Sequence, residues 1–455
     1  MKRTHAIKVG AAAVAAGCLV AAHGAPAVPA GPADAGLRLA AFRCDATPPP
    51  GETLIWDVKV AEVTDPLLLK GVVLDDGATR HVLCALDWCL LCNASERAFR
   101  EALARAAGTD PARVAVHCVH QHTAPCADED AHRLLDGAPA HLTSGFLDGL
   151  RARAGEAVAE AVRRLEPVDR VGCGAAPVER VASERRLVGP DGGIITRFSQ
   201  GGRDPAMAEL PEGDIDPLLR TITFARGDKV VARLHYYATH PQTHSCDGSA
   251  SADFVGAARE ALEREEGIPQ VYFTGCAGNV TVGKYNNGTP QARDDLARRL
   301  HAAMRAAAAA TRFAPAGPLS WRTEAVVLPV KADDGVLRQS RADLASPDAG
   351  RRVYFGAMRL ATAARARQPF VLSALRLGTI RILHLPGEPM LEFQRFAQRC
   401  RPDDFVVVAG YGDCAPAYLC TDRAFTEGGY EPDASNLAPG AEPLVKGAIE
   451  RLLGP

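Results

Sequence analysis

The chain has few aromatic residues and no excess of charge of either sign. Its 455 residues include 52 Lys and Arg against 54 Asp and Glu, and Phe, Trp and Tyr together make up 5%. A balanced charge excludes the broad basic surface that nucleic-acid-binding domains present, so we expect no nucleic-acid partner. With 47% hydrophobic and 23% charged residues, the composition is that of a folded globular protein.

The chain also lacks any apolar run of the roughly 20 residues that a membrane-spanning helix requires. Its first residues are cationic, and a short apolar run that ends in small residues follows them. This pattern predicts a secretory signal peptide over 1–24 and a linker rich in Pro, Ala and Gly over 25–37. We therefore expect an exported protein, either periplasmic or secreted. Because AAGC resembles a lipobox, a lipid anchor on Cys18 is the alternative to free secretion.

Paired CxxC motifs are absent as well. Cys89 and Cys92 form one CxxC, but no second one accompanies it among the thirteen cysteines, which argues against a zinc ribbon. An exported chain with this many cysteines permits disulfides, for example one that involves Cys414 and Cys420. Buried free thiols are the alternative, and the sequence does not decide between the two.

Apolar runs of strand length alternate with helical patterns along the chain. An amphipathic helix is expected after a cap at Asn93 or Ser95. The spacing of apolar residues predicts further helices at 144–165, 253–266, 290–312, 351–366, 389–399 and 440–453.

Two β-hairpins are predicted by their turns, one at Gly227 and Asp228 and the other at Gly378 and Thr379. Hairpins mixed with strand and helix units indicate an α/β fold, in which mixed β-sheets pack together and are flanked by helices. No internal boundary is visible, so we expect a single domain over 38–455.

Five strand-like runs end in polar clusters, the position at which rigid scaffolds place functional groups. In RVAVHCVHQHTAP, His120 and His122 stand two residues apart, so on an extended strand they share a face while His117 points the other way. Two further runs lead to His240 and to Glu388.

A catalytic zinc site uses about three protein ligands and keeps one position open. His120, His240 and Glu388 supply such a set from three strand ends. Each has a plainer interpretation, however. A histidine after a strand is usually a hydrogen-bonded loop residue, and an acid such as Glu388 at a helix N-terminus favours the helix dipole. His235 and His244 are alternative ligands near His240.

Other polar residues near these strand ends have weaker signals. His117 and His384 are expected inside strands and have no clear role. Asp253 either orients a metal-bound imidazole or caps a helix. The tyrosines at 411, 418 and 430 most often only pack and hydrogen-bond.

In their order along the chain, these segments resemble the catalytic domain of the neutral, non-lysosomal ceramidase family. The landmarks span residues 40–432: DATPPP at 45–50, CALDW with Asp87, VHQHTAP at 119–125, ATH at 238–240, an SxDxxG element at 251–256, GNVTV at 278–282, PGE at 386–388, AYLCT at 417–421 and GGYEP at 428–432. No single landmark is specific, and their shared order carries the resemblance.

The resemblance implies an exported zinc-dependent amidohydrolase that cleaves the N-acyl amide bond of ceramide or a related lipid by metal-activated water. His120, His240, Glu388 and Tyr418 would hold Zn²⁺. His122 would handle protons or stabilise an oxyanion, while Arg185 in SERRL would contribute to the site and Thr281 would stand near the substrate.

The resemblance has limits. Gln121, Ala124 and Asn279 depart from the family elements, and the chain stops soon after the last landmark, so no C-terminal immunoglobulin-like domain is expected. Metal-dependent hydrolysis is therefore better supported than ceramide as the substrate. The alternatives are an esterase or amidase on another substrate, or a non-catalytic binding protein. Peripheral contact with a membrane is compatible with a lipid substrate, and the oligomeric state is not predicted.

Overall fold

The computed structural model describes residues 36–135, 142–346 and 350–454. The predicted signal peptide, most of the predicted linker and Cys18 lie outside the described residues. Within the described ranges, no helix has both the length and the apolar character needed to cross a membrane.

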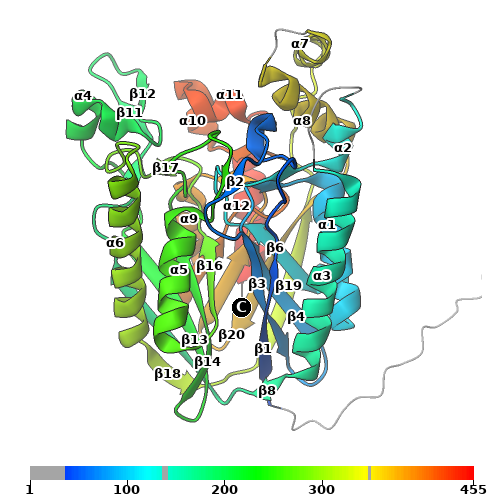
Figure 1. Cartoon of the computed structure of the whole chain (residues 1–455), viewed down its shortest axis with the longest axis vertical. Coiled ribbons are helices and arrows are strands. Elements are labelled where there is room, and N and C mark those ends of the chain that lie inside the picture. The colour runs from blue at the N-terminus through cyan, green and yellow to red at the C-terminus, as the bar shows by residue number, and fades with distance from the viewer. Residues whose placement is uncertain (1–35, 136–141, 347–349, 455) are drawn as a thin grey trace, which may run out of the picture.

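Three mixed β-sheets form the centre of the molecule (Figure 1). The first has the order β6-β4-β3-β1-β8, with β4 and β6 parallel and the other neighbours antiparallel. Its strands are β1 (Arg38–Asp45), β3 (Leu68–Asp75), β4 (Arg80–Leu86), β6 (Val114–Cys118) and β8 (Glu166–Pro167). Helices α1 (Asn93–Ala107) and α3 (Ser144–Arg163) pack on it.

The second sheet has the order β16-β14-β13-β9-β18, with β14 and β16 parallel. Its strands are β9 (Arg170–Pro177), β13 (Leu218–Arg226), β14 (Lys229–Tyr237), β16 (Gln270–Thr274) and β18 (Arg312–Pro315). Helices α5 (Asp253–Glu266) and α6 (Pro290–Ala309) pack on it. The hydroxyl of Thr289 caps α6 by accepting from the Ala292 amide at 3.2 Å, and Pro290 occupies the first helical position.

The third sheet has the order β19-β20-β21-β23, with β21 and β23 parallel. Its strands are β19 (Leu319–Val326), β20 (Phe370–Leu377), β21 (Ile380–His384) and β23 (Phe405–Ala409). Helices α9 (Leu391–Cys400) and α12 (Ala441–Leu453) pack on it.

The parallel edge strands of the three sheets meet at their carboxyl ends. The amide of Cys118, the last residue of β6, donates to the Tyr411 carbonyl at 2.8 Å, and the Gly410 amide after β23 donates to the Thr274 carbonyl of β16 at 3.0 Å. The Thr274 hydroxyl donates to the Val119 carbonyl at 2.7 Å. Loops that leave the three sheets are therefore brought to one place.

Short elements connect the sheets. The short strands are β2 (Glu62–Val63), β5 (Leu90–Leu91), β7 (Cys126–Ala127), β10 (Ser183–Glu184), β11 (Arg186–Val188), β12 (Ile194–Thr196), β15 (Ser249–Ala250), β17 (Val280–Thr281), β22 (Glu388–Pro389) and β24 (Tyr418–Leu419). The remaining helices are η1 (Ile55–Asp57), η2 (Pro111–Arg113), η3 (Gly201–Arg203), α2 (Glu129–His132), α4 (Pro205–Glu209), α7 (Asp334–Ala345), α8 (Arg352–Ala364), α10 (Asp422–Glu427) and α11 (Tyr430–Ala434).

The predicted mixed sheets flanked by helices are confirmed, as are both hairpin turns, since Arg226 pairs with Lys229 and Leu377 with Ile380. All six further helices are present, with ends that differ by up to three residues.

The cap predicted for α1 is wrong. Neither Asn93 nor Ser95 stands at the N-cap, which is Cys92 and makes no side-chain capping bond. Instead the Asn93 amide donates to the Asp413 carboxylate and the Ala94 amide to the Asp130 carboxylate, each at 3.0 Å. Carboxylates from distant segments thus satisfy the free amides of the helix, which local sequence does not reveal.

All cysteines in the described ranges are free thiols, including Cys414 and Cys420. Of the two alternatives that the sequence left open, the structure has free thiols, and both Cys414 and Cys420 are buried. Burial raises the pKa of Cys420 and of Cys414 above the usual value, so these thiols are protonated and unreactive.

Candidate metal centre

Three of the predicted ligands converge on one point. His120 follows β6, His240 follows β14 and Glu388 begins β22 after β21. Glu388 Oε2 lies 3.1 Å from His120 Nε2 and 3.3 Å from His240 Nε2, and all three side chains are buried. One ligand atom from each lies within 4.8 Å of those of the other two, which makes this group able to hold a metal ion.

Backbone carbonyls orient both imidazoles. His120 Nδ1 donates to the Cys89 carbonyl at 2.8 Å, and His240 Nδ1 donates to the Ala277 carbonyl at 2.7 Å. Each ring therefore carries its proton on Nδ1 and turns the lone pair of Nε2 toward Glu388, the tautomer that a metal ligand needs. Burial also lowers the pKa of His240 to about 4, so this imidazole is neutral near pH 7.

The contacts among the three residues do not satisfy their polar atoms. His240 Nε2 and Glu388 Oε2 are buried and make no aligned hydrogen bond, despite the short distance between them. Burial alone would raise the pKa of Glu388, but His120 and His240 hold it well below its usual range. Two imidazoles and a carboxylate whose donor atoms face one another fit a divalent zinc ion.

His122 also lies at the metal centre, but the backbone conformation that places it there differs from the one predicted. The predicted extended strand is wrong here, because β6 ends at Cys118 and His120 adopts a positive φ of 77°. The turn at His120 brings His122 Nε2 within 3.3 Å of His120 Nε2. His122 lines a pocket, and its Nδ1 is buried without a partner among the described residues. Burial holds the pKa of the ring well below its usual range.

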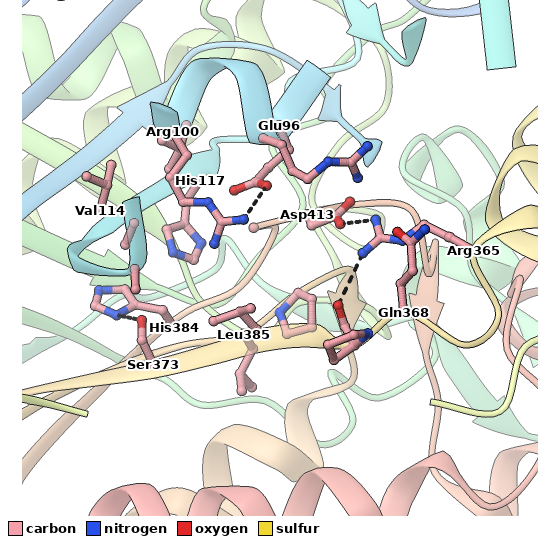
Figure 2. A pocket seen from close by; sticks show the side chains of 18 residues that line it. Glu96, Arg100, Val114, His117, Arg365, Gln368, Ser373, His384, Leu385 and Asp413 are labelled. Atoms are coloured by element: carbon pink, nitrogen blue, oxygen red, sulfur yellow. Dashed lines mark hydrogen bonds and ion pairs between the residues drawn. The ribbon is translucent and has the colours of Figure 1, made fainter. Parts of the chain in front are cut away.

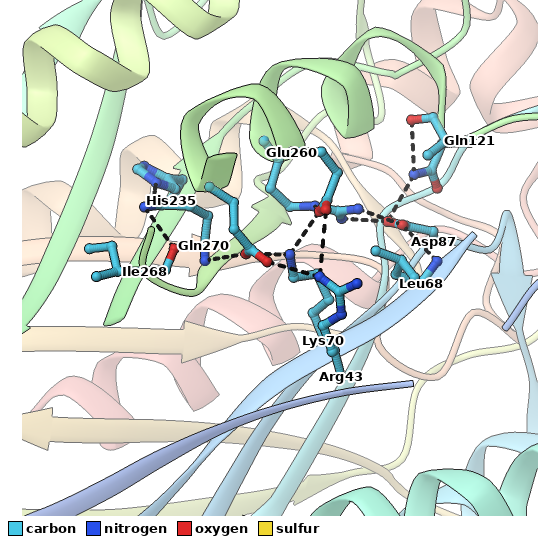
Figure 3. A network of polar contacts seen from close by, with 12 residues as sticks. Arg43, Leu68, Lys70, Asp87, Gln121, His235, Glu260, Ile268 and Gln270 are labelled. Atoms are coloured by element: carbon cyan, nitrogen blue, oxygen red, sulfur yellow. Dashed lines mark hydrogen bonds and ion pairs between the residues drawn. The ribbon is translucent and has the colours of Figure 1, made fainter. Parts of the chain in front are cut away.

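A buried ion pair holds Gln121, the residue between the two histidines in the sequence, and Figure 3 shows Gln121 beside Asp87. Arg259 on α5 donates to both carboxylate oxygens of Asp87, each at 2.8 Å. Gln121 Nε2 donates to Asp87 Oδ1 at 3.1 Å. Asp87 and Arg259 are 0% and 1% exposed. This network ties the histidine loop to the first two sheets, and it gives Asp87 a positioning role.

Arg185 lies beside the metal centre in a cage of other groups. Its Nε donates to Glu431 Oε1 at 2.7 Å, and its Nη2 donates to the Gly278 carbonyl. The guanidinium carbon lies 5.1 Å from the ring centre of Tyr418 and 5.2 Å from that of Tyr430. Glu431, which is 0% exposed and was not anticipated, therefore holds the arginine against both rings.

Tyr418 stands next to the candidate ligands. It pairs with Glu388 in the parallel ladder of β22 and β24, and its ring stacks on that of His240 with centres 6.5 Å apart. Burial raises the pKa of Tyr418 well above its usual value, although Arg185 opposes this shift. Its place among the ligands stays a prediction.

Thr281 in β17 follows Val280, whose carbonyl accepts from the His240 amide at 3.0 Å. Its hydroxyl is buried and has no partner. Gly278, three residues earlier, lies so close to β22 that an added Cβ would be 2.5 Å from the Glu388 carbonyl oxygen. Only glycine permits this approach, which explains one residue of the GNVTV element.

Three other candidates are engaged elsewhere. Asp253 accepts from the amide and hydroxyl of Thr243 at 2.9 and 2.7 Å rather than orienting an imidazole. His235 is bonded within the second sheet to Thr221 and Gln270. His244 lies 3.6 Å from Asp247.

The cavity at the metal centre is small. Its volume is about 30 Å³, and the residues that line it include His122, Tyr418 and three large side chains, Trp56, Phe355 and Met358. Sequence reasoning missed these three because they come from η1 and α8, which are far from the ligand loops along the chain. Their spacing carries no signal of such a role.

A separate cavity of about 320 Å³ is lined by His117 and His384, the residues with no role in the sequence analysis (Figure 2). The two rings lie 5.2 Å apart, and His117 Nδ1 donates to the Gly410 carbonyl at 2.6 Å. Arg365 pairs with Asp413 across the cavity at 2.5 Å. His117 thus faces away from the metal centre, as predicted.

No protein-family model and no curated protein matches this chain. Several solved structures do, among them two ceramidase structures. A ceramidase complexed with C2 is 14% identical, with a TM-score of 0.68 over 92% of this chain and 75% of the ceramidase. Neutral ceramidase from Pseudomonas aeruginosa is 16% identical, with a TM-score of 0.67 over 92% of this chain and 74% of that enzyme. The chain therefore has the neutral ceramidase fold, as its resemblance predicted.

Proposed function

We propose that the protein is an exported zinc-dependent amidohydrolase of the ceramidase type. The observation that carries the proposal is the convergence of His120, His240 and Glu388 in the fold of neutral ceramidases, with His240 Nε2 and Glu388 Oε2 left without a hydrogen-bond partner among the described residues. These residues, with Tyr418, would hold Zn²⁺. A bound zinc ion would lower the pKa of water toward neutrality and polarise a carbonyl oxygen.

The protein's own groups supply the remaining steps. His122 is neutral and has a free Nδ1, so it is the group that accepts a proton at the start of the reaction and returns it to the leaving amine. Arg185, fixed by Glu431, places a permanent positive charge near the reacting carbonyl, where it favours the developing oxyanion. The Thr281 hydroxyl has no hydrogen-bond partner among the described residues, and the proposal places it near the substrate.

The substrate class is an N-acyl amide, ceramide or a related lipid. Support comes from the two ceramidases that share the fold and from the apolar side chains around the cavity. An ester is the second candidate, because the same groups act on any carbonyl with a protonatable leaving group.

The test is hydrolysis of a fluorogenic N-acyl sphingosine by the purified mature protein. Turnover that is lost on chelation and restored by zinc supports the proposal. A zinc-loaded protein that hydrolyses no N-acyl amide would overturn it, and parallel assays with the matching esters would then identify an esterase.

A further inference from the structure

Large side chains fill the space above the metal centre. Trp56 on η1 and Phe355 and Met358 on α8 line the cavity that contains His120, His122 and Glu388. A volume of about 30 Å³ holds about two water molecules. Cavities that enclose a drug-sized ligand measure about 300 Å³ or more. A long acyl chain therefore does not fit beside the metal centre in this arrangement.

The side chains that close the cavity are held in place. The rings of Trp56 and Phe355 are in contact, with centres 4.6 Å apart and planes at 42°. Beside them the Tyr354 hydroxyl bonds the Asp57 carboxylate, whose pKa is raised by burial despite this bond. The Ile55 amide donates to the Ala124 carbonyl at 2.9 Å, which ties η1 to the loop that carries the two histidines.

The backbone of η1 is also unusual. Trp56 and Asp57 both have positive φ, 61° and 64°. Such values cost about 1 kcal/mol or more for residues other than glycine and persist only where surrounding contacts impose them. The contacts with α8 and with the histidine loop therefore fix Trp56 over the metal centre.

A second small cavity lies beyond this wall. It also has a volume of about 30 Å³, and its lining combines apolar side chains such as Leu54 and Leu135 with the carboxylates of Asp57 and Asp128. Trp56 and Met358 line both cavities. These two side chains thus separate the two cavities, and shortening either one would join the cavities into one longer channel.

We infer that Trp56, Phe355 and Met358 determine acyl-chain length at the metal centre, so that the protein accepts short N-acyl groups and excludes long ones. This inference rests on the proposed function and narrows its substrate class. Acyl groups of acetyl or butyryl size occupy the space beside Glu388, whereas an octanoyl or palmitoyl chain requires the volume that Trp56 and Met358 fill.

The test compares binding and hydrolysis along one series of chain lengths. Zinc-loaded protein is titrated with acetohydroxamate, butyrohydroxamate and octanohydroxamate, and N-acetyl, N-butyryl, N-octanoyl and N-palmitoyl amides of one amine are assayed in parallel. We expect the wild type to favour the short members of both series. Trp56→Ala should reverse the preference, because each newly buried methylene contributes about a factor of four in affinity.

Further variants separate chain selection from general damage. Met358→Ala should also admit longer chains, and Trp56→Phe should shift the preference less than Trp56→Ala. Leu444→Ala, a truncation of a 45% exposed side chain on α12, is the matched control and should leave the preference unchanged. Should Trp56→Ala fail to fold, Met358→Ala carries the test.

The outcomes distinguish the two proposals. A wild type that prefers long hydroxamates, or variants that leave the chain preference as it was, would overturn the inference about chain length. If hydroxamates bind selectively by chain length but no amide is hydrolysed, the inference about chain length is supported and the proposed amidase activity is overturned. Binding of no hydroxamate to the zinc-loaded protein would overturn both.

Discussion

At the scale of single residues, the metal centre depends on three buried side chains whose donor atoms face one another. His120, His240 and Glu388 were predicted from strand ends, and the structure brings them within 4.8 Å of one another. Their tautomers were not predictable, because they depend on the carbonyls of Cys89 and Ala277, which the fold supplies.

His122 should be separable from the metal ligands. We expect His122→Ala to keep its zinc and its fold while kcat falls by about 10²- to 10⁴-fold, the usual contribution of a general acid or base. Zinc analysis and steady-state kinetics on the same preparation provide the check. Full activity of the variant would remove His122 from the reaction.

Prediction from sequence stopped where distant segments meet. Glu431 lies in the GGYEP landmark, but nothing in the sequence indicated that it holds Arg185, and Trp56, which closes the cavity, lies in no motif. The histidine pair illustrates the opposite case. Its convergence was predicted for the wrong reason, since a turn with positive φ at His120, and not an extended strand, brings the rings together.

At the scale of elements, buried polar contacts hold the ligand loops to the sheets. Strand periodicity and turn residues were sufficient to predict the hairpins and most helices, because those signals are local. The start of α1 was not predictable, since its free amides are satisfied by Asp413 and Asp130 from other segments.

The ion pair of Asp87 with Arg259 tests whether buried polar contacts stabilise the ligand loops. Asp87→Ala leaves a buried guanidinium without its carboxylate, which costs about 3 to 5 kcal/mol of unfolding free energy. Urea denaturation measures the loss. The double variant Asp87→Leu with Arg259→Met is the control and should recover much of it, because no buried charge is left unpaired.

His235 should make the second sheet sensitive to acid. Burial lowers its pKa to about 4 from the usual value of 6.5, so its contribution to stability is complete above pH 6.5 and is lost as the pH falls toward 4. Between pH 7 and pH 5 this amounts to about 2 kcal/mol. We expect the free energy of unfolding of His235→Gln to fall by about 2 kcal/mol less than that of the wild type between pH 7 and pH 5. Urea denaturation at both pH values measures the difference. Equal losses would contradict the expectation.

At the scale of the whole molecule, the metal centre lies where loops from three sheets meet. Each sheet ends in a parallel edge strand, and hydrogen bonds join the carboxyl ends of β6, β16 and β23 beneath the ligands. Sequence alone indicated mixed sheets but not this junction, because it is formed by contacts between strands that lie far apart along the chain.

A metal held at that junction should stabilise the entire chain. Zinc at about 1,000 times its dissociation constant adds about 4 kcal/mol to the free energy of unfolding. We therefore expect chelation to lower Tm by several degrees and zinc to restore it. His240→Ala, which lacks a ligand, should unfold at the same temperature with and without the chelator, and a response equal to that of the wild type would place the metal elsewhere.

Zinc content is the measurement that tests the central claim most directly. Purified wild type, His120→Ala and His240→Ala are dialysed against dilute zinc and analysed for bound metal, with His235→Gln as a control in which a buried histidine outside the site is replaced. The account predicts one zinc ion in the wild type and the control, and little in the two ligand variants. Undiminished zinc in both ligand variants would contradict it.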